Sequence, residues 1–207
     1  MKDYGSILKG SWSNIRNVYD QTSIDVREEG ERWYPEANRL AQVVGSLTGL
    51  PKYKQLAAGA GIIAALSPQS DWGSNISNAL LTASEGTQKQ TAANHNKAMR
   101  IRNGENPDEV LGGLKVKAFY HAILEPLNSH SPVTIDRHAV AIYLGRTPGA
   151  DSGKAFSNIH VWKRIEGAYE RAAKHLGVNA HAVQATTWVE WRYRKGLATR
   201  IGVSADA

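Results

Sequence analysis

Residues 133–140 of this chain read Val133-Thr134-Ile135-Asp136-Arg137-His138-Ala139-Val140. A loop precedes Asp136, and apolar residues after it recur at helical spacing as far as Leu144, which predicts a short helix. Gly145 marks its expected end. An Asp in the first turn of a helix accepts backbone N–H bonds, and the helix dipole favours its charged form. Asp136 is therefore either a plain N-cap or a carboxylate positioned for chemistry on a ligand.

The helical period of this stretch continues in both directions along the chain. Further helices are predicted at about 33–49, 56–66, 75–83, 91–101, 119–124, 161–175 and 181–195, with a first segment at Ile15 and a helix start at 106–109. Pro35 is expected close to the start of its helix, where proline is tolerated. Residues 146–153 predict a turn-rich linker. Because no segment of strand length alternates in hydropathy, we expect an all-α fold of roughly eight to ten helices.

Composition excludes several kinds of site. The chain has no cysteine, which rules out disulfides, Cys-based zinc sites and Cys-ligated iron–sulfur clusters. Its seven histidines include no His-x-x-x-His pair in metalloprotease spacing. A formal charge of +6 favours polyanionic partners. Since the chain shows neither a signal-peptide core nor an apolar run of membrane-spanning length, we expect a cytoplasmic protein without membrane contact. No pattern bears on its oligomeric state.

A glycine pair lies in a second informative stretch, Leu111-Gly112-Gly113-Leu114-Lys115-Val116-Lys117-Ala118. Backbone amides of a glycine turn in front of a helix can hold a phosphate. Lys115 borders the apolar face of the following helix, whereas Lys117 is expected to be more exposed. Taken by themselves, both lysines are compatible with the role of a solvated or phosphate-binding cation.

The third stretch, Leu66-Ser67-Pro68-Gln69, follows a buried helix, and Asn75 comes six residues after Gln69. Ser67 and Gln69 either cap the neighbouring helices or present polar side chains to a ligand. A glutamine amide pairs with base edges, and its slim stem can enter a duplex.

Together the three stretches resemble the helix-hairpin-helix DNA glycosylases, the superfamily that includes endonuclease III and 8-oxoguanine glycosylase. The resemblance spans roughly 56–195 and implies a glycosylase-like helical bundle with two small lobes. Residues 1–207 would form one helical domain, with 1–55 as N-terminal helices that complete the core. Double-stranded DNA is the implied partner and an extruded nucleotide the implied substrate. The chain is similar to compact, divergent branches of the superfamily, which occur among phage and bacterial proteins.

The resemblance also implies roles for individual residues. Asp136 takes the place of the catalytic aspartate, and Lys115 or Lys117 that of the lyase nucleophile that attacks C1′. Gln69 takes the place of the residue that fills the gap left by the extruded base. The other implied DNA contacts are Ser67, Asn75, Gly112, Gly113, Arg137, His138 and Arg192. A monovalent cation at the Gly112-Gly113 hairpin is the one cofactor implied, and no other metal site is expected.

A weaker match covers the last predicted helix. Trp188 and Trp191 are expected to belong to the core rather than to stack on bases. Basic residues at its end predict a phosphate-facing edge made by Arg192, Arg194, Lys195 and Arg200.

The chain departs from the superfamily in three respects. Gly112 and Lys115 stand where the hairpin has a proline and its second glycine, the segment from Gln69 to Lys115 is shorter, and the C-terminal iron–sulfur loop is missing. Three functions therefore stay open. The first is a base-excision glycosylase with or without lyase activity. The second is a base-hypermodification transferase, in which Asp136 deprotonates an incoming amine or water, and the third is a non-catalytic DNA-binding module.

Overall fold

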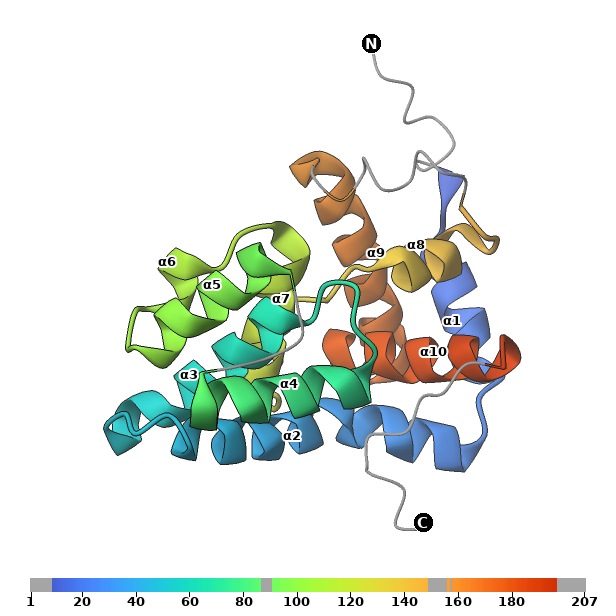
Figure 1. Cartoon of the computed structure of the whole chain (residues 1–207). Coiled ribbons are helices and arrows are strands. Elements are labelled where there is room, and N and C mark those ends of the chain that lie inside the picture. The colour runs from blue at the N-terminus through green and yellow to red at the C-terminus, as the bar shows by residue number, and fades with distance from the viewer. Residues whose placement is uncertain (1–8, 87–90, 149–155, 157, 197–207) are drawn as a thin grey trace. The chain divides into compact units, whose positions relative to one another are not determined.

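The computed structural model describes residues 9–86, 91–148, 156 and 158–196. Over these residues the fold is all-α, as expected, with ten helices and no strand (Figure 1). The helices are α1 (Trp12–Asp20), α2 (Ile24–Ser46), α3 (Lys52–Leu66), α4 (Trp72–Glu85), α5 (Ala92–Arg102), α6 (Pro107–Val110), α7 (Leu114–Leu124), α8 (Arg137–Leu144), α9 (Ile159–Leu176) and α10 (Ala180–Arg194). Most of the predicted linker at 146–153 lies outside the described residues.

The chain divides into two compact units. Among the described residues, unit 1 comprises those within 9–34 and 128–196, and unit 2 those within 35–127. Helix α2 therefore contributes its first part to unit 1 and its second part to unit 2. Whether the chain acts as the single domain expected over 1–207 stays a prediction.

Local chemistry sets the ends of several helices. Gly86, Gly145 and Gly177 follow α4, α8 and α9 with φ of 72°, 67° and 70°, in the left-handed region that glycine adopts without a steric penalty. The side chain of Asn106 accepts the backbone N–H of Asp108 at 3.2 Å and caps α6. The structure thus confirms the predicted helix end at Gly145 and the predicted helix start at 106–109.

The predicted place of Pro35 at the start of a helix is wrong. Helix α2 begins at Ile24, where Ser23 Oγ accepts the N–H of Val26 at 3.3 Å, and Pro35 lies in the helix interior. The first turns are polar and charged, so the apolar period that signals a helix begins only near Trp33. An interior proline removes one backbone hydrogen bond, and packing of α2 on both sides of Pro35 compensates for that loss.

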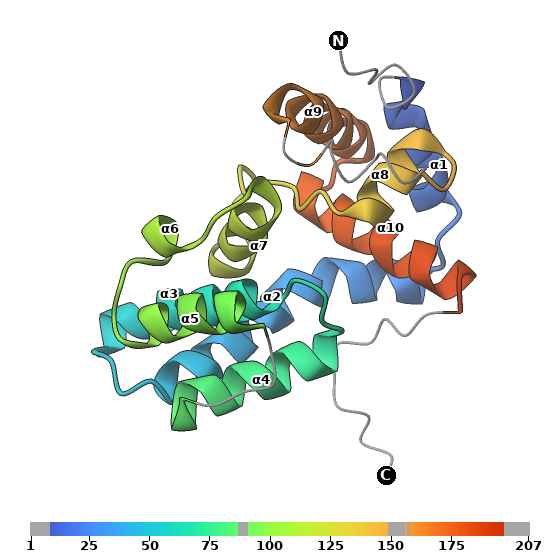
Figure 2. The ribbon, with the colours of Figure 1, turned by 45° about the horizontal axis from the view of Figure 1, so that its top comes forward.

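Unit 1 packs α1, α8, α9 and α10 against one another, together with the first part of α2 (Figure 2). Gly30 of α2 sits on Thr186 of α10, where a Cβ on the glycine would lie 2.2 Å from Thr186 Oγ1 and 2.3 Å from Thr186 Cα. The two helices can approach this closely only because residue 30 has no side chain. The largest fully buried side chains of this unit are Ile15, Ile135, Ile142, Tyr143, Ile165 and Tyr169.

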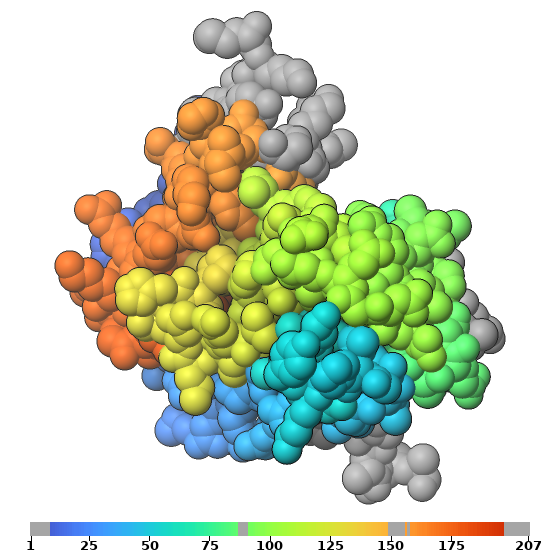
Figure 3. All heavy atoms as spheres, turned by 90° about the vertical axis from the view of Figure 1, so that its left-hand side faces the viewer, coloured from blue at the N-terminus to red at the C-terminus, as the bar shows by residue number. Residues whose placement is uncertain are grey.

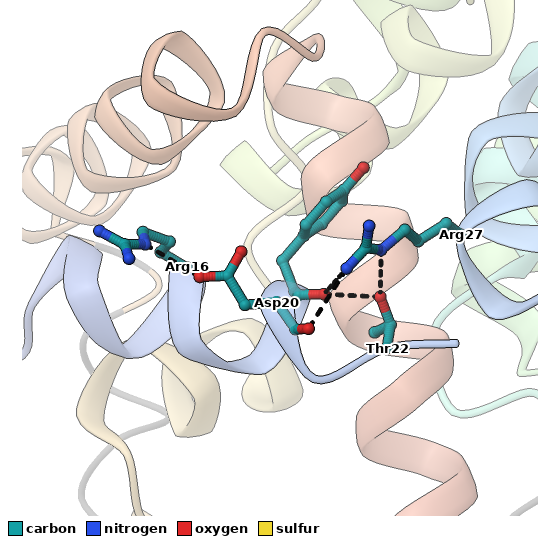
Figure 4. A network of polar contacts seen from close by, with 5 residues as sticks. Arg16, Asp20, Thr22 and Arg27 are labelled. Carbon is teal, nitrogen blue, oxygen red and sulfur yellow. Dashed lines mark hydrogen bonds and ion pairs between the residues drawn. The ribbon is translucent and has the colours of Figure 1, made fainter. Parts of the chain in front are cut away.

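Arg27 holds the turn between α1 and α2 (Figure 4). Its Nε donates to Thr22 Oγ1 at 3.0 Å, and its Nη2 donates to the carbonyls of Tyr19 and Asp20 at 3.3 and 3.2 Å. Thr22 Oγ1 in turn donates to the Tyr19 carbonyl at 2.6 Å, and Arg16 pairs with Asp20 at 2.9 Å. These bonds satisfy carbonyls that the end of α1 would otherwise leave open.

Helix α3 is the centre of unit 2, because α4, α5, α6 and α7 all pack on it. Residues 58–66 are buried, as expected of a helix with neighbours on every side. Gly45 and Gly59 bring α2 and α3 together. A Cβ at Gly45 would lie 1.9 Å from the Gln55 carbonyl oxygen, and one at Gly59 would lie 1.9 Å from that of Ala41. Figure 3 shows the outer surface formed by the start of α3 and by α5 and α6.

Candidate functional site

Asp136 is the N-cap of α8 and is half-buried. Its Oδ1 accepts the backbone N–H of Ala139 at 2.8 Å, and its Oδ2 accepts the indole N–H of Trp188 at 3.2 Å. Two donors from two different helices therefore fix both oxygens of one carboxylate. An N-cap bond alone would leave the second oxygen free to rotate to water, so Asp136 is held more firmly than a plain cap requires.

Trp188 brings several predicted site residues together. The guanidinium of Arg192 lies over the Trp188 ring at 4.6 Å from its centroid, within the range of a cation–π contact. The rings of His138 and Trp33 meet Trp188 edge-on, with centroids 6.5 and 6.0 Å away. A carboxylate, an imidazole and a guanidinium thus gather around one half-buried indole.

Two buried tyrosines lie close to the Asp136 carboxylate. The Tyr34 hydroxyl is bonded to Thr134 Oγ1 at 2.9 Å and to Gln184 Oε1 at 3.0 Å, and the Tyr169 hydroxyl lies 3.4 Å from the Ala139 carbonyl oxygen. Burial raises the pKa of both phenols well above the usual value, and the negative charge of Asp136 raises each pKa further. Both phenols therefore stay protonated, so the acidic charge near these rings is carried by Asp136.

Within unit 1 the structure brings together three of the predicted site residues, Asp136, His138 and Arg192, around Trp188. Arg137 is exposed on the first turn of α8, and its Nε lies 3.5 Å from His138 Nε2. The organising residue, Trp188, was expected to be a core residue and is instead half-buried. A signal for it was present in the sequence, because residues 184, 188 and 192 lie four apart and share one face of α10.

The predicted phosphate-facing edge at the end of α10 is only partly available for binding. Arg194 donates to Glu190 Oε1 at 2.6 Å and to Gln21 Oε1 at 2.9 Å. Lys195 lies over the Trp191 ring at 5.6 Å. Arg192 contacts Trp188, and Arg200 lies outside the described residues. Among the described cations of this group, Arg192 is the one that lies on Trp188, whose indole donates to Asp136.

Unit 2 holds the Ser67, Gln69 and Asn75 group. Ser67 is the C-cap of α3, and its Oγ donates to the Ala64 carbonyl at 2.9 Å. Asp71, rather than Gln69, caps α4 by accepting the Ser74 N–H at 3.0 Å. Gln69 is exposed, and it is the one residue other than glycine with a positive φ, of 62°, among those the structure describes. Such outliers concentrate at functional sites.

Asn75, one of the implied DNA contacts, is buried. Its exposed fraction is 2%, and its Oδ1 has no hydrogen-bond partner among the described residues. In this conformation the side chain faces the interior of unit 2 and cannot touch a duplex outside it.

The glycine pair forms a short connection between the four-residue helix α6 and α7. Gly113 is the N-cap of α7 with a φ of 79°, which only glycine adopts readily. Both glycines are exposed, and the ammonium of Lys97 lies 3.9 Å from where a Gly112 Cβ would stand. This ammonium supplies a positive charge at the hairpin itself, and a further monovalent cation there stays a prediction.

The two candidate nucleophiles differ in their partners. Both Lys115 and Lys117 are half-buried, so the expected difference in exposure between them is small. Lys117 Nζ donates to the Asp108 carbonyl at 2.8 Å, whereas Lys115 Nζ makes no hydrogen bond or ion pair to the described part of the chain. Both lysines belong to unit 2 and Asp136 to unit 1.

Neither a metal cluster nor a membrane span is found in the part of the chain that the structure describes. No three of its His, Asp and Glu side chains group so that they could hold a metal ion. None of its helices combines the length and the hydropathy needed to cross a bilayer.

The chain belongs to the family of unknown function DUF7178, whose sequence pattern matches residues 2–195. The match covers both units. Comparison with curated proteins and with solved structures found no match. The arrangement of side chains is therefore the basis for a functional proposal.

Proposed function

We propose that this protein is a DNA-binding enzyme that acts on a nucleotide extruded from duplex DNA, on a helix-hairpin-helix glycosylase-like scaffold. The observation that carries the proposal is the Asp136 carboxylate, held by the Ala139 and Trp188 N–H groups beside Arg192. A half-buried carboxylate fixed at the first turn of a helix can stabilise positive charge that develops on a substrate.

The chemistry follows from the position of that charge. When the bond between C1′ and the base nitrogen breaks, the base leaves with the electron pair and the sugar becomes an oxocarbenium ion. Asp136 stabilises this cation and then accepts a proton from the water that adds to C1′. Arg192, with its guanidinium on the Trp188 ring, is placed to neutralise a phosphate of the same nucleotide.

Gln69 and the glycine hairpin support the DNA partner. Gln69 is an exposed side chain held in a strained backbone conformation at the junction of α3 and α4, as a residue that enters a duplex would need to be. The exposed amides of Gly112 and Gly113 before α7, with the Lys97 ammonium nearby, suit a backbone phosphate. If the enzyme is also a lyase, Lys115 is the preferred nucleophile, because the Lys117 ammonium already donates to Asp108.

The test uses purified protein and duplexes carrying uracil, 8-oxoguanine, hydroxymethyluracil or an abasic site. Asp136→Asn keeps an oxygen that caps α8 but turns an amide NH2 group towards the Trp188 N–H, so its free energy of unfolding should fall by about 1–2 kcal/mol while base release is lost. Asp136→Ala removes both acceptors and should lose base release together with about 2–3 kcal/mol of stability. Asp71→Asn, at the N-cap of α4, is the matched control and should leave base release unchanged.

Borohydride trapping on the abasic duplex then separates the chemical outcomes. An adduct that Lys115→Ala abolishes and Lys117→Ala retains would establish a lyase. If wild type binds duplex DNA but releases no base and forms no adduct, the glycosylase proposal is wrong, and the transferase or the binding module takes its place. If Asp136→Asn still releases the base, Asp136 has only the structural role of a helix N-cap.

A further inference from the structure

At most helical glycines of this chain a side chain would collide with a neighbouring helix, but at Gly167 it would not. A Cβ on Gly30, Gly45 or Gly59 would collide with a neighbouring helix at 2.2 Å or less. At Gly167, in the middle of α9, a Cβ would meet no atom of the described chain within 4 Å outside its own stretch of helix. Glycine destabilises a helix interior relative to alanine. No packing inside the protein accounts for this cost at Gly167.

Gly167 lies at the centre of the solvent-exposed face of α9. Helical spacing places six exposed residues on the same face, which we call the basic face: His160, Lys163, Arg164, Glu170, Arg171 and Lys174. Four of them carry a positive charge, and Glu170 is the one acidic group among them. The bare backbone at Gly167 is therefore surrounded by cations one turn away in either direction.

Two of the four cations on this face have a hydrogen-bond or ion-pair partner within the protein. Lys163 pairs with the buried Glu166 at 2.6 Å, and Arg164 Nε donates to the Tyr143 hydroxyl at 3.3 Å. Arg171 and Lys174 make no hydrogen bond or ion pair to any residue that the structure describes. Two exposed cations without an internal partner, one and two turns after a glycine that packing does not require, point to a ligand outside the chain.

We propose that the basic face of α9 binds the phosphate backbone of duplex DNA, and that Gly167 lets that backbone come close to the helix. This inference rests on the DNA partner of the proposed function. The excess of positive charge selects a polyanion, and a second copy of the same face would bring like charges together. Glycine is the residue that permits the closest approach of a ligand to a backbone.

This contact is separate from the Asp136 site. Tyr169 lies two residues after Gly167, about 200° around the helix, and its hydroxyl faces the Ala139 carbonyl of α8. The Asp136 cluster therefore lies behind α9 with respect to the basic face, and Figure 2 shows α9 on the outside of unit 1. The basic face would hold DNA in place without touching the reacting nucleotide.

The experiment measures fluorescence anisotropy of a labelled undamaged duplex over a series of salt concentrations. Arg171→Ala with Lys174→Ala should weaken binding about tenfold or more and reduce the slope of log K against log salt by about two. Gly167→Gln, which fills the face without removing a charge, should also weaken binding, with helix content checked by circular dichroism. Glu170→Gln should strengthen it. Lys9→Ala with Arg146→Ala removes two exposed cations of unit 1 outside α9, and should have a smaller effect.

Each outcome bears on one proposal. If Arg171→Ala with Lys174→Ala keeps the wild-type affinity and salt slope, or if Gly167→Gln keeps the wild-type affinity, the proposed role of the basic face is wrong. The proposed function would still stand in that case if wild type releases a base. If the α9 variants lose binding to poly-glutamate but bind duplex DNA as wild type does, the face binds an acidic protein and the inference is overturned. If the α9 variants weaken duplex binding but wild type acts on no base, the basic face stands and the glycosylase proposal fails.

Discussion

The indole Nε1 of Trp188 donates to Oδ2 of Asp136 at 3.2 Å, across 52 residues of sequence. This bond ties α10 to the first turn of α8 and holds the carboxylate in one orientation. It also explains why Arg192, which lies on the same indole, is close to the acid.

Trp188→Phe keeps an aromatic ring but removes the donor to Asp136. We expect the free energy of unfolding, measured by urea denaturation, to fall by about 1–2 kcal/mol, because a hydrogen bond to a half-buried charged group is lost. Trp191→Phe on the same helix is the control, since Trp191 donates to no carboxylate in the described structure. Equal losses in the two variants would mean that ring volume, rather than the bond, accounts for the effect.

Gln69 has a left-handed backbone conformation that costs about 1 kcal/mol for a residue with a Cβ. Gln69→Gly should therefore raise the free energy of unfolding by about that amount, whereas Gln69→Ala should leave it near wild type. Both variants should lower base release, because both lose the amide that we propose enters the duplex. Base release at the wild-type level in Gln69→Ala would exclude Gln69 as the inserted residue.

Gly30 and Gly167 should respond in opposite directions to alanine. Gly30→Ala should lower the free energy of unfolding by about 3 kcal/mol, because its Cβ would overlap the Thr186 backbone and force α2 and α10 apart. Gly167→Ala should raise it by about 0.5–1 kcal/mol, because its Cβ enters open space and alanine favours the helix. Urea denaturation of the two variants checks both signs, and a loss of stability in Gly167→Ala would reveal a contact that this structure does not contain.

The protein should lose stability in alkali because of its buried tyrosines. Burial raises the pKa of Tyr34 and Tyr169 above the ordinary 10.0, and raises that of Tyr120 to about 12. The unfolded chain then gives up these protons first, so stability is fully present below about pH 10 and falls as the pH rises beyond it. The expected slope is about 1.4 kcal/mol per pH unit for each such tyrosine.

Urea denaturation midpoints from neutral pH upwards measure this slope. Tyr34→Phe and Tyr169→Phe should each make it shallower, and an unchanged slope in both variants would contradict the assignment. Tyr34→Phe should also lose about 1–3 kcal/mol at neutral pH, because Thr134 and Gln184 lose a buried partner.

Sequence patterns predicted most of the helices and named Asp136, His138 and Arg192 as site residues, but they did not indicate the residue that brings these three together. Gly145 and Asp136 delimit α8 through interactions within a few residues, so their roles were predictable from local chemistry. The predicted helix start near Pro35 was wrong, because the first turns of α2 are polar and packing of the helix compensates for a proline in its interior. Trp188 was expected in the core, since nothing near it in sequence shows that an acid from another helix accepts its N–H.

The sequence by itself determined the all-α class, the caps and the glycine ends of the helices, because these depend on side chains and backbone within one turn. It also indicated Asp136 as the acid, and the likeness to the helix-hairpin-helix glycosylases stays a prediction from its motifs. Only the tertiary structure placed Trp188, His138 and Arg192 around that acid, and showed that the bare backbone of Gly167 faces solvent. Those facts depend on contacts between residues far apart in the chain, which local spacing does not encode.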